Sequence, residues 1–241
     1  MSTSTATQKS PENTALPAYW QSNVPLCDYT TLKIGGPARY MACCDSTEQL
    51  VETLNIARTQ SLPVFVLGEG SNILISDQGF DGVVIRNTDR RVEAVHEDVE
   101  SMTLQVSAGM HWDNFVALIV QQGLGGIECL SGIPGTVGAA PIQNIWAYGQ
   151  DVGSVIVSVG VIDRDAENPE PKQIAGEECD FHYRTSRFKT EWHNLIVTDV
   201  TFRLPKTTKG TVRYSECRWL LPIGEQEGNA SVNSVRQAIL D

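Results

Sequence analysis

The sequence predicts an α+β fold in which two units lie side by side, and three observations carry that prediction. Residues 39–67 read as a strand, an amphipathic helix and a second strand, and residues 104–123 read as another strand followed by a helix. Residues 195–204 form a last run of alternating apolar and polar residues, which is typical of a strand. Two glycine-rich stretches fall near strand ends, where both are available to one cleft between the units.

In the first unit, residues 39–44 are predicted to form a strand, and residues 46–49 (STEQ) have the spacing of a capping box, which marks a helix N-terminus. The apolar face of this helix is formed by Leu50, Leu54 and Ala57. Pro63 ends the helical segment and residues 64–67 return as a strand, so the three elements form a βαβ unit. Residues 83–86 close the unit as a further strand.

In the second unit, residues 104–107 alternate in polarity and predict a strand. The helix that follows ends at Gly123. Its apolar stripe is formed by Trp112, Phe115, Val116, Ile119 and Val120. A stripe at this spacing indicates a core face rather than a cofactor site. Further strands are expected at residues 155–163 and 195–204, and a polar turn at residues 164–171.

Composition and charge narrow the class of protein. Of the 241 residues, 41% are hydrophobic and 20% are charged, as in an ordinary soluble protein, and the net charge of −11 argues against nucleic acid and anionic membranes as partners. The cysteines lack C-x-x-C and zinc spacings and the histidines are scattered, so no metal site is expected. No apolar run is long enough to span a membrane, and no signal-peptide core is present. With thiols expected to be free, these features predict a cytoplasmic protein.

Residues 131–149 (SGIPGTVGAAPIQNIWAYG) are rich in glycine and carry no charged side chain. Glycine loses more backbone entropy on folding than any other residue, so such a run needs a compensating reason. One reason is the close approach of backbone amides to the phosphate or carbonyl oxygens of a ligand. A buried, uncharged connection between two elements is the alternative, and the glycine pattern alone does not separate the two.

A second glycine motif, GEGSN at residues 68–72, follows one predicted strand and precedes another apolar run, residues 73–75, which also reads as a strand. The motif lacks the third glycine and the helix of the dinucleotide-binding fingerprint G-x-G-x-x-G. What remains is a tight turn whose amides, with the side chains of Ser71 and Asn72, can cradle a pyrophosphate. An ordinary turn is the alternative.

Four motifs, in the same order, resemble the UDP-N-acetylenolpyruvoylglucosamine reductase family, the flavoenzymes of bacterial peptidoglycan synthesis. They are TTLKIGG at residues 30–36, the GEGSN turn, the SGIPGTVGAAPIQNIWAYG stretch, and the adjacent Tyr183 and Arg184 in DFHYRTSRFK. The resemblance runs from about residue 28 to residue 214. Thr30 stands where the family has Asn, and Trp146 stands where it typically has glycine.

The resemblance implies a two-subdomain FAD-binding fold of the vanillyl-alcohol-oxidase type, with non-covalent FAD and with NADPH as reductant. It implies reduction of UDP-N-acetylglucosamine enolpyruvate to UDP-N-acetylmuramate, a step in cell-wall synthesis on which cell shape and division depend. The cofactor-binding residues that it implies are Gly68, Glu69, Gly70, Ser71, Asn72, Ser131, Gly132, Ile133, Pro134, Gly135, Val137, Gly138 and Gln143. Cys129 is the nearest residue for a covalent flavin link, which is not expected.

By the same resemblance, Arg184 is the residue expected to act on the substrate. A guanidinium offers a rigid fork of donors and stays charged, so it can hold a carboxylate and stabilise a developing enolate. A solvated surface arginine is the alternative. The expected substrate-binding residues are Tyr148, Tyr183 and Tyr214, although Tyr183 also suits a packing role. Asn144 is expected near the flavin edge or the substrate, and Arg187 and Lys189 in a solvated basic rim or a patch that steers a diphosphate.

The expected domains are a disordered tail at residues 1–17, FAD-binding subdomains at residues 18–90 and 91–218, and the start of a substrate domain at residues 219–241. Helical periodicity begins near residue 230. The family's proton-donating Ser or Cys and its C-terminal Glu have no counterpart here, so the chain is expected to bind FAD but to be a poor reductase. The complete enzyme is expected to be a monomer. The alternatives are a flavin-binding fragment without turnover and an FAD-dependent oxidase of similar fold.

Overall fold

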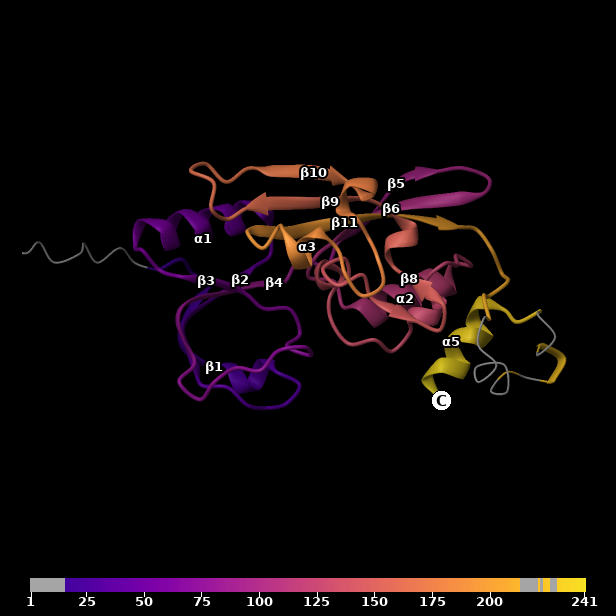
Figure 1. Ribbon diagram of the computed structural model, residues 1–241, viewed down its shortest axis with the longest axis horizontal. Helices are drawn as coiled ribbons and strands as arrows, with labels where there is room; N and C mark the ends of the chain where they lie inside the picture. The colour runs from indigo at the N-terminus through magenta and orange to yellow at the C-terminus, as the bar shows by residue number, and fades with distance from the viewer. Residues whose placement is uncertain (1–15, 213–220, 222, 226–228) are drawn as a thin grey trace, which may run out of the picture.

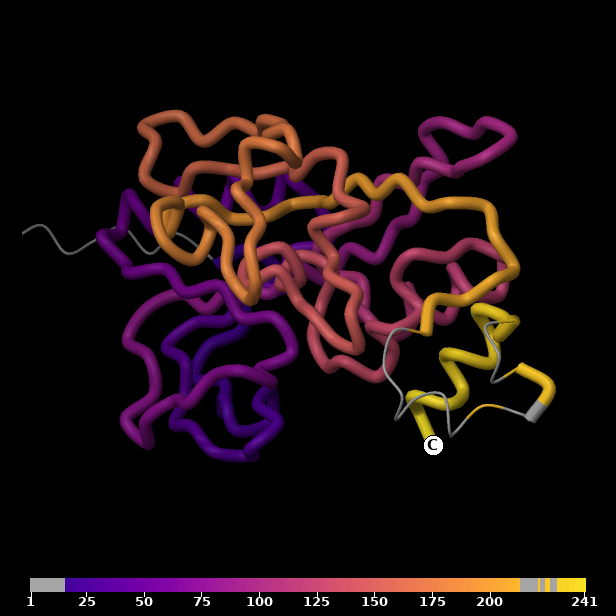
Figure 2. Tube along the Cα trace, turned by 45° about the vertical axis from the view of Figure 1, so that its right-hand side comes forward, coloured from indigo at the N-terminus to yellow at the C-terminus, as the bar shows by residue number. Residues whose placement is uncertain are grey.

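Two β-sheets and the helices that pack against them form the frame of the protein (Figure 1). The structure, a computed structural model, describes residues 16–212, 221, 223–225 and 229–241. The tail predicted at residues 1–17 lies almost wholly outside these described residues. Figures 1 and 2 both place the N-terminal unit and the C-terminal helix at opposite ends of the molecule, with the middle of the chain between them.

The first sheet has four strands in the order β1-β2-β4-β3. Its strands are β1 (Trp20–Pro25), β2 (Pro37–Cys44), β3 (Val64–Val66) and β4 (Phe80–Asn87). Both β2 and β3 pair with β4 in parallel, and β1 pairs with β2 in the antiparallel sense. The predicted βαβ unit is therefore present, with β4 inserted between its two strands.

The crossover helix α1 (Thr47–Thr59) begins where the sequence predicts. Ser46 is its N-cap, and the Ser46 Oγ accepts the N–H of Gln49 at 3.3 Å. The Gln49 side chain in turn accepts the N–H of Asp45 at 3.0 Å, which ties the entering chain to the first turn. The predicted apolar face is buried against the first sheet through Leu50, Leu54 and Ala57.

The second sheet has five strands in the order β10-β9-β11-β6-β5, and all neighbouring strands are antiparallel. Its strands are β5 (Val92–Glu97), β6 (Ser101–Ser107), β9 (Ile156–Asp163), β10 (Pro171–Ala175) and β11 (Leu195–Pro205). Ile162 of β9 and Ile196 of β11 belong to the same buried cluster as the apolar face of α1. The two sheets therefore share part of their core.

The helix α2 (Trp112–Gln121) packs on one face of the second sheet. The predicted stripe is buried, and the ring centroids of Phe115 and Phe202 of β11 lie 5.0 Å apart. Gly123, with a φ of +71°, follows the end of the helix as expected. The interpretation of this stripe as a core face is confirmed.

The remaining elements are short. They are η1 (Leu26–Tyr29), η2 (Glu128–Leu130), η3 (Val137–Ala139), β7 (Trp146–Ala147), β8 (Gln150–Asp151), η4 (Gly153–Val155), η5 (Gly176–Cys179), α3 (Arg187–Thr190), η6 (Ile223–Glu225) and α5 (Val232–Leu240). The helix α5 confirms the helical periodicity near residue 230, since Val232, Val235 and Ala238 are buried. None of the helices in the described part of the chain has the length and apolar content needed to cross a membrane.

The sequence did not predict β1, β5 or β10, each of which lies at the edge of its sheet. In β5 every residue after Val92 is exposed, and in β10 only Ile174 is partly buried. Such strands carry no apolar alternation, because one edge and much of both faces meet solvent. The polar turn expected at residues 164–171 is also shorter than predicted, since β10 begins at Pro171.

Residues 73–75 do not form the predicted strand. Ile73 and Ile75 pack against the buried cluster on the first sheet that contains Met41, whereas Leu74 between them is 73% exposed. The alternation therefore reflects a loop that buries every second side chain without pairing with a neighbouring strand. The turn that precedes it consequently leads into an extended loop and not into a strand.

Candidate functional site

The first glycine turn, residues 68–72, follows β3 at its carboxyl end and presses against Tyr29. Gly70 has a φ of +64°, and a Cβ there would lie 2.2 Å from the Tyr29 carbonyl oxygen, so a side chain would force the backbone apart. Among the described residues, no protein acceptor receives a hydrogen bond from the amides of this turn. The turn therefore presents several unused donors together, as anion-binding loops do.

The second glycine loop, residues 131–136, lies opposite the first turn. A Cβ on Gly68 would lie 3.4 Å from the Thr136 Oγ1, and, among the described residues, a Cβ on Gly135 would meet only the Ser71 Oγ, at 4.0 Å. Side chains at these two glycines would thus project toward the opposing loop. Glycine at both positions keeps the space between the loops open, as the sequence analysis expects of a ligand cradle.

Glu69 connects the two loops. Its Oε2 accepts the N–H of Gly135 at 2.8 Å, and its Oε1 contacts the Nδ1 of His111, the residue that precedes α2. The Glu69 side chain is 23% exposed, so this contact is partly shielded from solvent. The sequence predicts Glu69 as part of the cradle, and the structure adds a bridging role for its carboxylate.

A cavity of about 380 Å³ lies between the two loops. All residues from 68 to 72 line it, together with Ile133, Pro134, Gly135 and Gln143. A second cavity of about 310 Å³ adjoins it, shares Thr136 and Ala139 with it, and has mostly apolar walls. These walls include Phe65, Leu67, Phe188 and Trp192. The two cavities form one cleft, and apolar walls predominate in both of them.

Four predicted cofactor residues have contacts that anchor the second loop. The Val137 side chain is fully buried and does not reach the cleft. A Cβ on Gly138 would lie 2.6 Å from the Ala108 Cβ, so this glycine allows close packing on residues before α2. The Ser131 hydroxyl donates to the Glu128 carbonyl oxygen at 2.6 Å. Gly132 donates its N–H to Asp113, a contact treated below.

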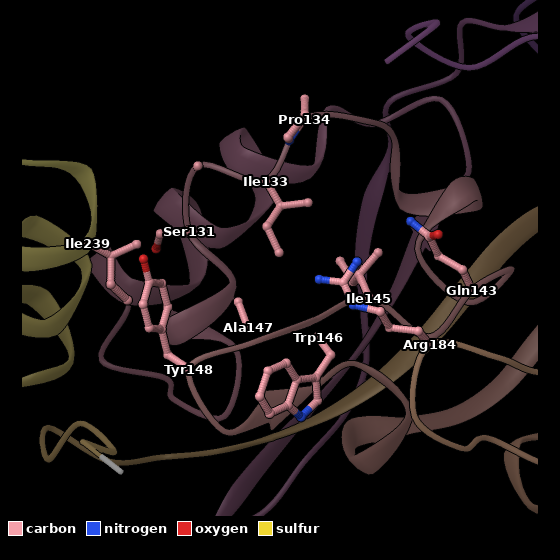
Figure 3. Close-up of a pocket in the computed structure, with 11 residues that line it drawn as sticks. Ser131, Ile133, Pro134, Gln143, Ile145, Trp146, Ala147, Tyr148, Arg184 and Ile239 are labelled. Carbon is pink, nitrogen blue, oxygen red and sulfur yellow. The ribbon is translucent and has the colours of Figure 1, made fainter. Parts of the chain in front are cut away.

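A third cavity, of about 640 Å³, opens beside the second loop (Figure 3). Arg184 points into it from one side, and Tyr148 and Ile239 border the opposite side. Gln143 also lines it. Both Arg184 and Tyr148 have left-handed backbones, with φ values of +52° and +47°. Non-glycine residues held in this region cluster at functional sites, because the strain must be offset by the surrounding structure.

The aromatic pair Trp146 and Tyr183 forms one border of this third cavity. Their ring centroids lie 5.3 Å apart with an interplanar angle of 75°, an edge-to-face arrangement. Trp146 lines the cavity, whereas Tyr183 is 69% exposed and lies against Trp146. The structure thus gives Tyr183 a packing contact. Tyr214, the third predicted substrate residue, lies outside the described residues.

Asn144, expected near the flavin or substrate, is buried and holds the segment that carries Arg184. Its Nδ2 donates to the His182 carbonyl oxygen at 2.9 Å, and its Oδ1 accepts the N–H of Gly153 at 2.8 Å. Lys189 donates to the Arg184 carbonyl oxygen at 3.2 Å and lines the first cavity. Asn144 therefore positions the segment, and Lys189 places a cation at the cleft.

Arg187, the other cation of the expected basic rim, is directed elsewhere. Its guanidinium lies 5.4 Å from the Trp192 ring centroid, and its Nε lies 3.6 Å from the Glu191 Oε2. Of the two cations, only Lys189 lines a cavity at the glycine loops. The sequence reasoning also missed His111 and Ile239, because nothing in a linear pattern shows which distant element will pack against a loop.

Proteins of known name and family are similar in sequence to this chain. Residues 38–168 match the FAD binding domain family. UDP-N-acetylenolpyruvoylglucosamine reductase from Thermobifida fusca is 42% identical over 219 residues, which are 90% of this chain and 60% of that protein. The reductase of the same name from Cutibacterium acnes is 39% identical, over 90% of this chain and 57% of that protein. The chain thus spans about 60% of the length of these curated relatives.

Solved structures agree on the fold. A UDP-N-acetylenolpyruvylglucosamine reductase from Thermus caldophilus superposes with a TM-score of 0.63 at 25% identity, over 91% of this chain and 66% of that chain. Cholesterol oxidase from Brevibacterium sterolicum gives 0.56 at 12% identity, over 83% of this chain and 40% of that chain, and this likeness shows the fold alone. The predicted α+β fold of the vanillyl-alcohol-oxidase type, with two FAD-binding subdomains, is confirmed as a fold class.

Proposed function

The chain belongs to the FAD-binding domain family. From this premise we propose that it acts in the reaction of a UDP-N-acetylenolpyruvoylglucosamine reductase. NADPH would be the reductant and UDP-N-acetylglucosamine enolpyruvate the substrate. The observation that carries the proposal is the continuity of the site. The cavity between the glycine loops and the cavity of Arg184 share Ile133, Pro134 and Gln143, so a cofactor in one would border a substrate in the other.

The residues of the cleft fit FAD. The unused amides of residues 68–72, with Ser71 and Asn72, would hold the negatively charged diphosphate. Gly68 and Gly135 would leave room for it, since a Cβ on either would enter the space between the loops. The apolar walls of the adjoining cavity would take a flat ring at one end of the molecule. FAD, when bound, would pass hydride from NADPH to the substrate.

Arg184 would hold the substrate carboxylate. Its fixed positive charge would stabilise the negative charge that spreads into the carboxylate when hydride is added to the neighbouring double bond. The Asn144 contact to His182 and the Lys189 contact to the Arg184 carbonyl oxygen would hold the Arg184 backbone in place for this role. Gln143 and Tyr148 would orient the substrate, because both line the same cavity as Arg184.

We propose that FAD is held without a covalent bond. Among the described residues, no His or Cys lines the cavity of the glycine loops or the cavity of Arg184, and His193 lines the adjoining apolar cavity. Cys129, the nearest candidate in the sequence, is buried, and its thiol donates to the Thr211 carbonyl oxygen at 3.1 Å. A flavin link would require this thiol to leave its present contact.

A cytoplasmic location is part of the proposal. The thiols of Cys43 and Cys44, neighbours in β2, form no disulfide, and burial raises the pKa of the Cys44 thiol to about 11, so it stays protonated and unreactive. Such thiols suit a reducing compartment. Nucleotide substrates such as NADPH and a UDP-sugar are consistent with the same location. A monomeric state for the complete enzyme remains a prediction.

The test is a titration of the FAD-loaded chain with UDP-N-acetylglucosamine enolpyruvate under anaerobic conditions. We expect the substrate to perturb the visible flavin spectrum and to reoxidise the reduced flavin only slowly, because the chain is expected to be a poor reductase. Arg184→Gln should slow reoxidation about 10²–10³-fold, while Arg203→Gln, on the second sheet, should not. A flavin-loaded chain that does not respond to this substrate would contradict the reductase proposal. Oxygen consumption with an alcohol substrate would favour an oxidase instead.

A further inference from the structure

The C-terminal helix α5 buries Val235 and Ala238 in a cluster with Cys129 of η2, and one ion pair joins it to the first turn of α2. Arg236 Nη1 donates to the Asp113 Oδ1 at 2.6 Å and Arg236 Nη2 to the Asp113 Oδ2 at 2.8 Å, a bidentate geometry that fixes the carboxylate plane. The Arg236 side chain is only 13% exposed. Its hydrogen bonds hold the pKa of Asp113 below the usual range, so the carboxylate is ionised at neutral pH.

The same carboxylate holds the second glycine loop. Asp113 Oδ1 accepts the N–H of Gly132 at 2.7 Å, and Gly132 has a φ of +72°. One oxygen of Asp113 therefore receives donors from both α5 and the loop. Since Arg236 fixes the carboxylate plane, the position of α5 also fixes the direction in which the Gly132 amide is held.

Two further contacts place α5 beside the loop. Ile239 lines the cavity of Arg184, and Figure 3 shows it near Ser131 and Tyr148. A Cβ on Gly132 would lie 3.1 Å from the Leu240 Cδ2, so the helix packs closely over this glycine. The helix thus borders both the loop that would hold the cofactor and the cavity beside it, although it lies outside the region of residues 38–168 matched by the FAD-binding family.

We propose that Asp113 is a positioning residue for the second glycine loop, and that Arg236 of α5 sets its carboxylate, so that α5 governs FAD affinity from outside the cleft. The inference rests on the FAD binding described above. Asp113 acts through the Gly132 amide and does not line the cavities of the glycine loops or of Arg184. A loop released from this hold occupies its binding conformation for less of the time, which lowers the apparent affinity by that fraction.

The experiment measures FAD affinity by fluorescence titration, with thermal unfolding of the FAD-free chain beside it. Asp113→Ala removes the ion pair and the acceptor for Gly132, and should weaken FAD about tenfold or more. Arg236→Gln leaves the acceptor in place and should weaken FAD about threefold. The matched control is Arg203→Gln, which removes an exposed ion pair with Asp98 on the second sheet and should leave FAD affinity unchanged.

A charge exchange separates positioning from simple docking. Asp113→Arg combined with Arg236→Asp restores an ion pair between α2 and α5 but leaves no acceptor for the Gly132 amide. We expect this double variant to recover thermal stability relative to Asp113→Ala while its FAD affinity stays as weak. If the exchange also restores FAD affinity to within twofold of the parent, Asp113 acts only by docking α5, and the inference is wrong.

The outcomes distinguish this inference from the proposed function. A parent chain that does not bind FAD would refute the proposed function itself. A parent that binds FAD, with an Asp113→Ala variant of equal affinity, would refute only the inference. If Asp113→Ala does not fold, the isosteric Asp113→Asn replaces it, because its amide oxygen can still accept from Gly132 but has no charge for Arg236. A loss of about threefold to tenfold would support the inference, and an unchanged affinity would overturn it.

Discussion

The two glycine loops face one cleft but differ in whether their backbone amides already have protein acceptors and in how they are held. The first turn, residues 68–72, is fixed by close backbone packing, because Gly70 is pressed against the Tyr29 carbonyl oxygen where no side chain fits. The second loop is held by two side-chain carboxylates, that of Asp113 at the Gly132 amide and that of Glu69 at the Gly135 amide. A substitution in the first turn should therefore have a direct and large effect on FAD affinity. Changes that reach the second loop should be smaller and should arise from several parts of the chain.

The largest effect is expected from Gly70→Ala. The new Cβ would fall 2.2 Å from the Tyr29 carbonyl oxygen in a left-handed backbone, so the turn must move. We expect FAD affinity to fall about 100-fold, measured by fluorescence titration. Gly224→Ala is the control, since a Cβ there meets none of the described residues within 4 Å. Equal losses in the two variants would show that the first turn has no special part in binding.

The bridge between the loops can be broken at Glu69. Glu69→Ala leaves the Gly135 N–H and the His111 imidazole without their shared acceptor. The free energy of unfolding should fall by about 1.5 kcal/mol, which corresponds to a melting temperature about 3–6 °C lower. The measurement is thermal unfolding of the FAD-free chain, with Glu97→Ala at an exposed ion pair as control. A Glu69→Ala chain as stable as its parent would show that the loops are not coupled through this carboxylate.

The hold of Asp113 on the second loop should depend on pH. Arg236 depresses the pKa of Asp113 in the folded protein. The stabilisation by this ion pair is therefore complete above the ordinary Asp pKa of about 4, and it is lost as the pH falls through the lower pKa that Asp113 has in the folded protein. The parent should be more stable than Asp113→Asn at pH 7 and pH 5, and the difference should narrow below pH 4. Denaturant unfolding at these pH values measures it. A difference that does not change with pH would contradict the ion-pair origin.

The smallest effect is expected at Ser71, which touches the second loop only weakly. Its hydroxyl lies 3.5 Å from the Pro134 carbonyl oxygen. Ser71→Ala should therefore change the free energy of unfolding by less than about 0.5 kcal/mol. FAD affinity should fall about threefold through loss of one neutral donor. A stability loss as large as that of Glu69→Ala would mean that Ser71, too, ties the loops together.

The sequence predicted the elements in which buried and exposed side chains alternate in a regular pattern. The capping residues of α1 and the stripe of α2 were both confirmed, because helix ends and core faces leave local patterns. The edge strands β5 and β10 were missed, because their exposed side chains leave none. The prediction of a strand at residues 73–75 was wrong for the opposite reason, since a loop can bury alternate isoleucines without a strand partner.

For the candidate site, the sequence located both glycine loops and Arg184, and the structure brings their segments to adjoining cavities. It could not show what holds them. Asp113 lies on α2 and its partner Arg236 on α5, separated by more than half the chain, and neither stands in a motif. The buried contacts of Asn144 were equally hidden, since an amide that would reach a ligand and one that ties a loop look the same in a sequence.

Hydrogen–deuterium exchange with and without FAD tests the central claim most directly, because the claim is that two loops form one cradle. Among the described residues, the amides of residues 68–72 have no protein acceptor, so they should exchange rapidly in the free chain. We predict that FAD slows exchange in residues 68–72 and in residues 131–136 together, with little change in the exposed edge strand β5. Protection of only one loop, or of neither in a chain that binds FAD, would contradict the claim.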